Sequence, residues 1–119
     1  MSVEKIKKLI RENDNLGNHL GVKLTEVSEG RAYAELKIEK HHLNAAGVTH
    51  GASIFALADI ALAAASNSYG KVALLTNGNI QVFHATQLGD TLTAKAKEVS
   101  ASRKLAHYRI KLTNSAAEQ

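Results

Sequence analysis

The chain has no cysteine, no tryptophan, and only three Tyr and two Phe among its 119 residues. Without thiols it can form neither a disulfide framework nor a thiolate zinc site. Its few aromatic rings offer no platform for stacked bases, and its 15 Lys and Arg are dispersed along the sequence, which argues against nucleic acid as a partner. No apolar run reaches the ~20 residues that span a bilayer, and no signal-peptide core is present. We therefore expect one cytoplasmic domain over residues 1–119, without a metal site or a membrane contact.

The charge and the size of the chain indicate what it does contain. A net charge of +4 and a pI near 9.4 suit a phosphorylated small molecule such as a nucleotide carrier. With 45% apolar residues the chain can bury one modest core, and a domain this small gains stability from self-association.

Hydrophobic periodicity predicts an α+β domain with an antiparallel sheet and one buried helix. Apolar residues at helical spacing predict an amphipathic helix over residues 3–16, ended by Gly17. Alternating apolar and polar residues predict half-buried strands. They cover residues 21–27, 32–38, 72–85, 92–96 and 106–112, the fourth of them followed by a turn at 100–104. We expect 72–85 to be one long strand bent at Gly78, although Asn77-Gly78 could instead form a hairpin turn.

Residues 51–69 form the predicted central helix, with Thr49 or His50 near its N-cap and Gly70 at its end. Its interior is almost entirely small or apolar, except for Asp59. Burying a carboxylate costs several kcal/mol unless something compensates for it. Asp59 therefore either performs a function or lies on a solvent-facing stripe of the helix.

The standard motifs of hydrolases and nucleotide-binding proteins are absent, which leaves a short set of candidate residues. There is no P-loop, no GxGxxG, no complete nucleophile elbow and no zinc-binding H-E-x-x-H, and we expect His41 and His42 to be solvated. The unpaired amides at a helix N-terminus suit an oxygen that acquires negative charge, and Gly51 would let an acyl group approach closely. Asp59 could act as general base or nucleophile, and Asn44 could position a water or a carbonyl.

One helix cannot bring Gly51 and Asp59 to the same carbonyl. They are eight residues apart, so about 12 Å of helix axis separates them. Two antiparallel copies of the helix across a two-fold axis would place Gly51 of one subunit near Asp59 of the other. We therefore expect a dimer, or a dimer of dimers.

The segment Asn44-x-x-Gly47-x-x-His50-Gly51-Ala52, followed by an apolar stretch and Asp59, resembles the PaaI-type hotdog-fold acyl-CoA thioesterases. The flanking sequences His19-Leu20-Gly21, Asn79 to Phe83 and Gly89 to Leu92 match as well, so the resemblance covers most of the chain.

The resemblance implies a hotdog fold, in which an antiparallel sheet wraps around one long helix, with a short helix before it. It also implies a thioester hydrolase that needs no cofactor, since CoA is part of the substrate. The Gly51 amide would polarise the thioester carbonyl, the partner's Asp59 would be base or nucleophile, Asn44 would orient the carbonyl or water, and His50 would shape the turn. Weaker candidates for contacts with the substrate and its CoA are Thr76, Asn77, Arg103 and Lys104.

The chain departs from the family pattern at two places. Ala52 replaces a second glycine and could narrow the acyl path. The family continues through one further strand after a turn like that of residues 113–119, so we expect one position in the sheet to be unfilled.

Three functions stay open. The first is hydrolysis of an aryl- or medium-chain acyl-CoA, the second is binding of acyl-CoA without turnover, and the third is hydration or dehydration of an acyl thioester. Hydrolysis is favoured over binding because no structural role for Asp59 is evident in the sequence. A hydratase would need a second acid or base, which the helix does not supply.

Overall fold

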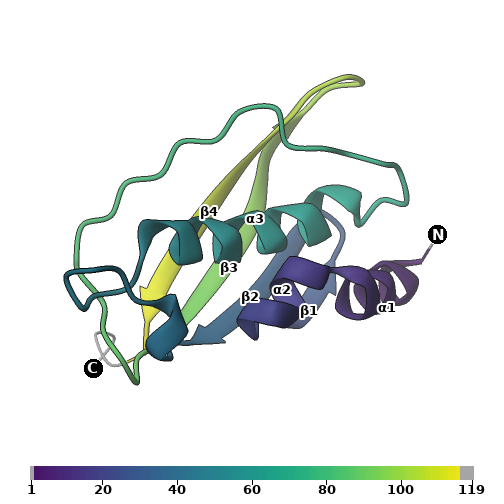
Figure 1. Cartoon of the computed structure of the whole chain (residues 1–119). Helices are drawn as coiled ribbons and strands as arrows, with labels where there is room; N and C mark the ends of the chain where they lie inside the picture. The colour runs from purple at the N-terminus through teal and green to yellow at the C-terminus, as the bar shows by residue number, and fades with distance from the viewer. Residues whose placement is uncertain (1, 116–119) are drawn as a thin grey trace.

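The computed structural model describes residues 2–115, which fold into a four-stranded sheet crossed by one long helix (Figure 1). The strands are antiparallel in the order β1-β2-β3-β4. This is the predicted α+β architecture. The elements in chain order are α1 (Val3–Asn13), α2 (Asn15–Leu20), β1 (Lys23–Ser28), β2 (Arg31–Lys37), the 3-10 helix η1 (Lys40–His42), α3 (Gly51–Asn67), β3 (Thr91–Ala101) and β4 (Ala106–Asn114).

The core lies between α3 and the inner face of the sheet. The alternation predicted for β2 is confirmed, because Ala32, Ala34 and Leu36 are buried. Their partners across the β2–β3 ladder are Ala96, Ala94 and Leu92. Most of these side chains are small, which lets the helix pack close to the strands through its own small residues, Ala61, Ala64 and Ala65.

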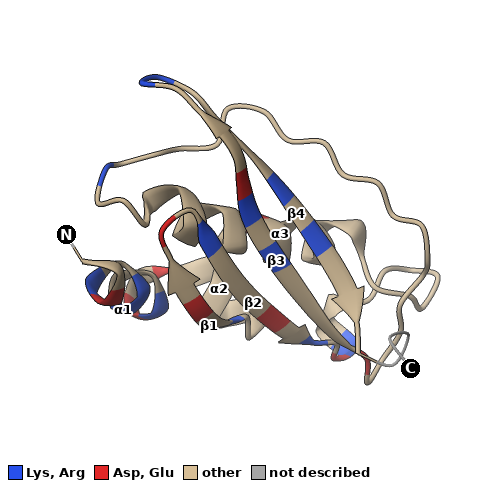
Figure 2. Cartoon of the chain, turned by 180° about the vertical axis from the view of Figure 1, so that it is seen from behind, with Lys and Arg blue, Asp and Glu red and all other residues tan. Residues whose placement is uncertain are grey.

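The outer face of the sheet carries charged side chains, many of them positive (Figure 2). Arg31, Lys97 and Arg109 are direct neighbours across β2, β3 and β4 and form what we call the cation row. Lys95 and Lys111 are paired next to it. Like charges directly opposite each other destabilise a sheet, so we expect the cation row to lower the stability of the fold.

The first helical segment differs from the prediction of one helix ended by Gly17. Helix α1 ends at Asn13, and the Asp14 carboxylate then caps α2 by accepting a hydrogen bond from the Gly17 N–H at 3.0 Å. Gly17 lies inside α2, where a Cβ atom would come within 2.5 Å of the Asp14 carboxylate and 2.9 Å of Ile60. Close packing therefore requires this glycine, and Gly21, at φ 87°, ends the helix instead.

The strand predicted over residues 72–85 is wrong for the described chain. Residues 71–85 instead form an extended strap that arches from the end of α3 towards the start of β3 (Figure 1). The Asn67 side chain holds its beginning through both backbone groups of Ala73. At its other end, Thr86 and Thr49 join through their hydroxyls at 2.7 Å and through a backbone hydrogen bond at 2.8 Å. An extended segment becomes a strand only when a neighbour satisfies its backbone, and no described residue does so between these anchors.

The remaining elements largely follow the prediction. Helix α3 begins at Gly51 with His50 as its N-cap, but it ends at Asn67 rather than at Tyr69. Strand β4 extends beyond the predicted residue 112 to Asn114, so Thr113 belongs to a strand and not to a turn. Among the described residues, β4 has a paired strand only on its β3 side. Residues 116–119 of the expected turn lie outside the described residues. None of the helices in the described part is long and apolar enough to cross a bilayer.

Candidate active site

The N-terminus of α3 presents an exposed amide group at Gly51. His50 caps the helix, and its Nδ1 accepts a hydrogen bond from the Ala52 N–H at 3.0 Å. No acceptor for the Gly51 N–H occurs among residues 2–115. A Cβ atom at Gly51 would meet nothing within 4 Å, so the chain's own packing does not require glycine at this position. The end of the helix is thus open to an oxygen ligand.

Asn44 organises the loop that leads into this helix. Its Oδ1 accepts hydrogen bonds from the N–H groups of Ala46 at 2.9 Å and Val48 at 3.2 Å. Its backbone closes the same turn with Val48, around Gly47 at φ 80°. The Nδ2 group has no acceptor within the described residues, so Asn44 can shape the loop and still donate a hydrogen bond to a ligand.

His42 is buried, contrary to the expectation that it is solvated. Its side chain is fully inaccessible, its Nδ1 lies 2.8 Å from the Glu39 N, and its Nε2 lies 2.7 Å from the Leu20 carbonyl oxygen. His41, by contrast, is exposed as predicted. The sequence holds no signal that separates these two adjacent histidines, because burial here depends on where α2 ends. Among the described residues no group of three or more side chains is suited to a metal ion.

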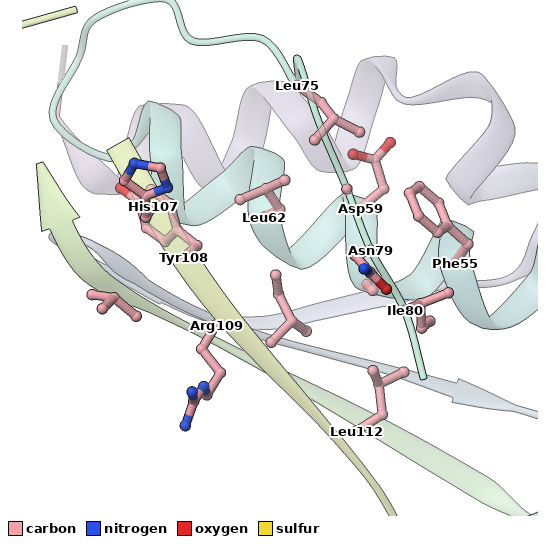
Figure 3. Close-up of a pocket in the computed structure, with 14 residues that line it drawn as sticks. Phe55, Asp59, Leu62, Leu75, Asn79, Ile80, His107, Tyr108, Arg109 and Leu112 are labelled. Atoms are coloured by element: carbon pink, nitrogen blue, oxygen red, sulfur yellow. The ribbon is translucent and has the colours of Figure 1, made fainter. Parts of the chain in front are cut away.

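Asp59 lies on the side of α3 that faces the strap. It lines a cavity of about 380 Å³ between α3, the strap and β4, together with Phe55, Leu75, Asn79 and Tyr108 (Figure 3). Partial burial, and secondly the negative charge of Asp14, raise the pKa of the Asp59 carboxyl above its usual value. Helix α3 thus carries its one carboxylate on a half-buried stripe, which is neither in the core nor fully in solvent.

The weaker candidates separate in space. Thr76, Arg103 and Lys104 share a second hollow of about 890 Å³ with Asp59, where β3 turns into β4. We call this hollow and the cavity of Figure 3, which Asp59 also lines, the trough. Arg103 and Lys104 are exposed in that turn. Asn77 is exposed and lines neither hollow. One group therefore gathers at the N-terminus of α3 (Asn44, His50, Gly51) and another along the trough (Asp59, Thr76, Arg103, Lys104).

A tyrosine–carboxylate cluster at the trough was not anticipated from the sequence. The hydroxyls of Tyr108 and Tyr69 each lie 3.3 Å from an oxygen of the Glu98 carboxylate. Burial, followed by the charge of Glu98 and the hydrogen bond to it, raises the pKa of Tyr108 to about 12. The alternation of β4 gives a hint, since Tyr108 shares the inward phase with Ile110 and Leu112. Glu98 and Tyr108 are direct cross-strand partners in the β3–β4 ladder, and the sequence alone does not give this register.

Comparison with known proteins shows the family of this chain. Residues 46–118 match the family model described as the thioesterase superfamily. A protein of Archaeoglobus fulgidus is 45% identical over 114 residues, which cover 96% of this chain and 74% of its own. The acyl-coenzyme A thioesterase PaaI of Escherichia coli is 33% identical over 103 residues, which cover 87% of this chain and 74% of its own.

Solved structures support the fold as well. The E. coli PaaI structure superposes with a TM-score of 0.92 at 30% identity, covering 96% of this chain and 83% of its own. The Streptococcus mutans protein smu.793, solved with bound acetyl-CoA, superposes with a TM-score of 0.76 at 25% identity, covering 80% of this chain and 77% of its own. The predicted hotdog fold is therefore confirmed, and the chain belongs to the thioesterase superfamily.

Proposed function

We propose that this protein hydrolyses an acyl-CoA thioester to a free acid and CoA, in a site shared by two subunits. The observation that carries the proposal is the unpartnered Gly51 amide at the open N-terminus of α3. A helix N-terminus suits the negative charge that the carbonyl oxygen gains when a nucleophile attacks. The relatives named as acyl-CoA thioesterases and the relative with bound acetyl-CoA support the choice of substrate.

In this scheme the Gly51 N–H binds the carbonyl oxygen, and the Asn44 Nδ2 group helps to orient the carbonyl or a water. The partner subunit's Asp59 either removes a proton from the attacking water or attacks the carbonyl carbon itself. In the first route the C–S bond breaks, the acid is released, and the proton that Asp59 took from the water passes to the CoA thiolate. In the second route the C–S bond breaks to leave an acyl–Asp59 anhydride, which a water then hydrolyses to the acid and the free carboxylate, and a proton from that water ends on the CoA thiolate. No separate cofactor takes part. His50 supports the site by capping the helix.

The strap supplies the proposed contact between subunits. Val72, Leu74 and Phe83 on it are 88%, 84% and 80% exposed, which is unusual for large apolar side chains that lie close together in sequence. We propose that two straps meet at a two-fold axis, where each could satisfy the other's free backbone groups. The two α3 helices would then lie antiparallel, with Gly51 of one near Asp59 of the other, in a dimer or a dimer of dimers.

The trough suggests where each part of the substrate lies. Phe55, Leu62, Leu75 and Ile80 give the smaller cavity apolar walls that suit an aryl or medium-length acyl group. We propose that Arg103 and Lys104 at the far end meet phosphates of CoA, and that Thr76, which lines the same hollow, contacts the substrate there. Asn77, exposed on the strap next to Thr76, is the weakest candidate because it lines neither hollow.

Subunit complementation tests the shared site. Asn44→Asp keeps the Oδ1 that holds the loop but removes the Nδ2 donor, and Asp59→Asn removes the carboxylate at nearly constant volume. Each variant alone should be inactive. After the two are unfolded together and refolded, a mixed dimer has one intact site and one site with both lesions. Random reassortment makes about half of the dimers mixed, so about a quarter of the parental activity should return.

Native mass spectrometry provides the control by counting the mixed dimers. If mixed dimers form but activity stays at the level of the single variants, Asp59 works with the Asn44 and Gly51 of its own chain, and the shared site is wrong. If the parent protein releases no thiol from any acyl-CoA of a panel from acetyl to phenylacetyl and decanoyl, hydrolysis itself is wrong.

A further inference from the structure

His42 occupies a junction between three elements that are separate in the sequence. Its ring reaches the Leu20 carbonyl at the end of α2 and the Glu39 N–H at the start of η1. Its own carbonyl accepts the His50 N–H at 2.8 Å and the Ser53 hydroxyl at 3.3 Å. Because His50 is the N-cap of α3, one buried residue connects the end of α2 to the residue that precedes the Gly51 amide.

The two ring contacts determine which nitrogen carries the proton. A carbonyl oxygen can only accept a hydrogen bond, so Nε2 must donate to Leu20. A backbone N–H can only donate, so Nδ1 must accept from Glu39. The neutral ring with its proton on Nε2 is the one form that satisfies both partners. Because the ring is fully buried, no water could pair with a ring nitrogen that lost its partner.

We propose that His42 is a positioning residue, which fixes the start of α3 so that the Gly51 amide points at the thioester carbonyl. This role rests on the hydrolysis proposed above. His42 does not touch the substrate: its fully buried ring holds the loop, and its carbonyl holds His50. Displacement of an oriented donor by about 1 Å can lower a rate by ~10²-fold. Substitution of His42 should therefore change kcat more than it changes KM.

Three substitutions test this role at temperatures where each variant is fully folded. His42→Phe keeps the ring shape and removes both ring hydrogen bonds, whereas Asn can replace only the Nδ1 acceptor and Gln only the Nε2 donor. For the Phe variant we expect kcat per folded protein to fall roughly 10- to 100-fold, with KM within about 3-fold of the parent. The Asn and Gln variants should fall between the parent and the Phe variant. They also keep the test valid if the Phe variant does not fold.

His41→Phe is the matched control, because His41 is exposed and its ring lies beside that of His42 at a centroid distance of 4.0 Å. It should leave kcat and KM at the parental values. If the His42 variants melt at lower temperature but keep the parental kcat, His42 only stabilises the fold and the proposal is overturned.

Nuclear magnetic resonance adds readouts that do not depend on activity. Ring nitrogen shifts of the parent should show Nε2 protonated and Nδ1 bare, and the Gly51 amide resonance should move in the His42 variants but not in His41→Phe. A ring protonated on Nδ1, or a Gly51 amide that all His42 variants leave unmoved, would refute the positioning role. If the parent hydrolyses no acyl-CoA, the proposed function fails, and these two spectra alone decide whether His42 positions the amide.

Discussion

The negative charge of Asp14 acts on the carboxyl group of Asp59. Asp14 caps α2 beside Ile60, the residue that follows Asp59 on α3. Its charge is the second cause, after burial, of the raised pKa of Asp59. If the ionised form of Asp59 takes part in catalysis, kcat/KM decreases as the pH falls below that pKa.

Asp14→Asn should therefore move the acidic limb of the kcat/KM profile to lower pH. Removing the negative charge favours ionisation of Asp59, while asparagine can still cap α2 through its Oδ1. The limb should stay above the range of an ordinary aspartate, because burial acts first and is unchanged. Glu12→Gln removes the same charge from an exposed position on α1 and should leave the profile in place. An unmoved limb in Asp14→Asn would show that the charge of Asp14 does not act on the group whose ionisation limits kcat/KM.

Among the elements, the sheet shows a conflict that a single exchange should relieve. Lys97 lies between Arg31 and Arg109, so both of its cross-strand neighbours carry its own charge. Lys97→Glu turns two repulsive neighbours into attractive ones and should raise the free energy of unfolding by about 0.5 to 1 kcal/mol at low salt. Urea denaturation at low and high NaCl measures this, and the gain should shrink as salt screens the charges.

Lys37→Glu is the control for charge alone. Lys37 lies on β2, on the same face of the sheet as Lys97, but its cross-strand partner is the neutral Thr91. Its stability should change by less than that of Lys97→Glu. Equal effects in both variants would mean that net charge, and not the cation row, governs stability.

How well the sequence predicts an element depends on whether that element is set by its own residues or by contacts with distant parts of the chain. Strand β2 was predictable because its apolar residues Ala32, Ala34 and Leu36 alternate with polar ones in the sequence. Helix α3 was predictable because His50 can serve as an N-cap and an alanine-rich run follows it. The strap was not, because apolar alternation gives a strand only when a neighbour pairs with it. Gly17 ends a helix by propensity, yet close packing against Ile60 keeps it inside one.

The candidate site was predictable to a similar extent. Gly51, His50 and Asn44 do gather at one helix end, as their spacing in the sequence indicated. His42 was misread as solvated, since its burial arises from the meeting of α2 and η1, which no local pattern encodes.

At the scale of the whole molecule, the strap exposes more large apolar side chains than a stable monomer would be expected to expose. We expect sedimentation velocity at micromolar concentration to show a dimer or a dimer of dimers and not the 12.7 kDa monomer.

Leu74→Asp should shift this equilibrium towards monomer, because Leu74 is 84% exposed in the single chain and would be covered only by a partner. Leu105→Asp is the control and should remain associated, because Leu105 is 59% exposed in the β3–β4 turn and does not lie on the strap. A monomer in the parent protein would contradict both the dimer and the shared site.

The strap is anchored twice, by Asn67 at its beginning and by the Thr49–Thr86 pair at its end. With both ends fixed to rigid elements, its interior can change in length at little entropic cost, since doubling a flexible loop costs only about 0.6 kcal/mol. The wall of the trough can therefore diversify while the sheet and α3 stay as they are. In the proposed scheme the acyl group lies against the strap, whereas the reacting carbonyl lies at the loop and helix that hold Asn44, Gly51 and Asp59. Changes on the cavity side of the strap would then alter the selectivity for acyl groups and leave the chemistry in place.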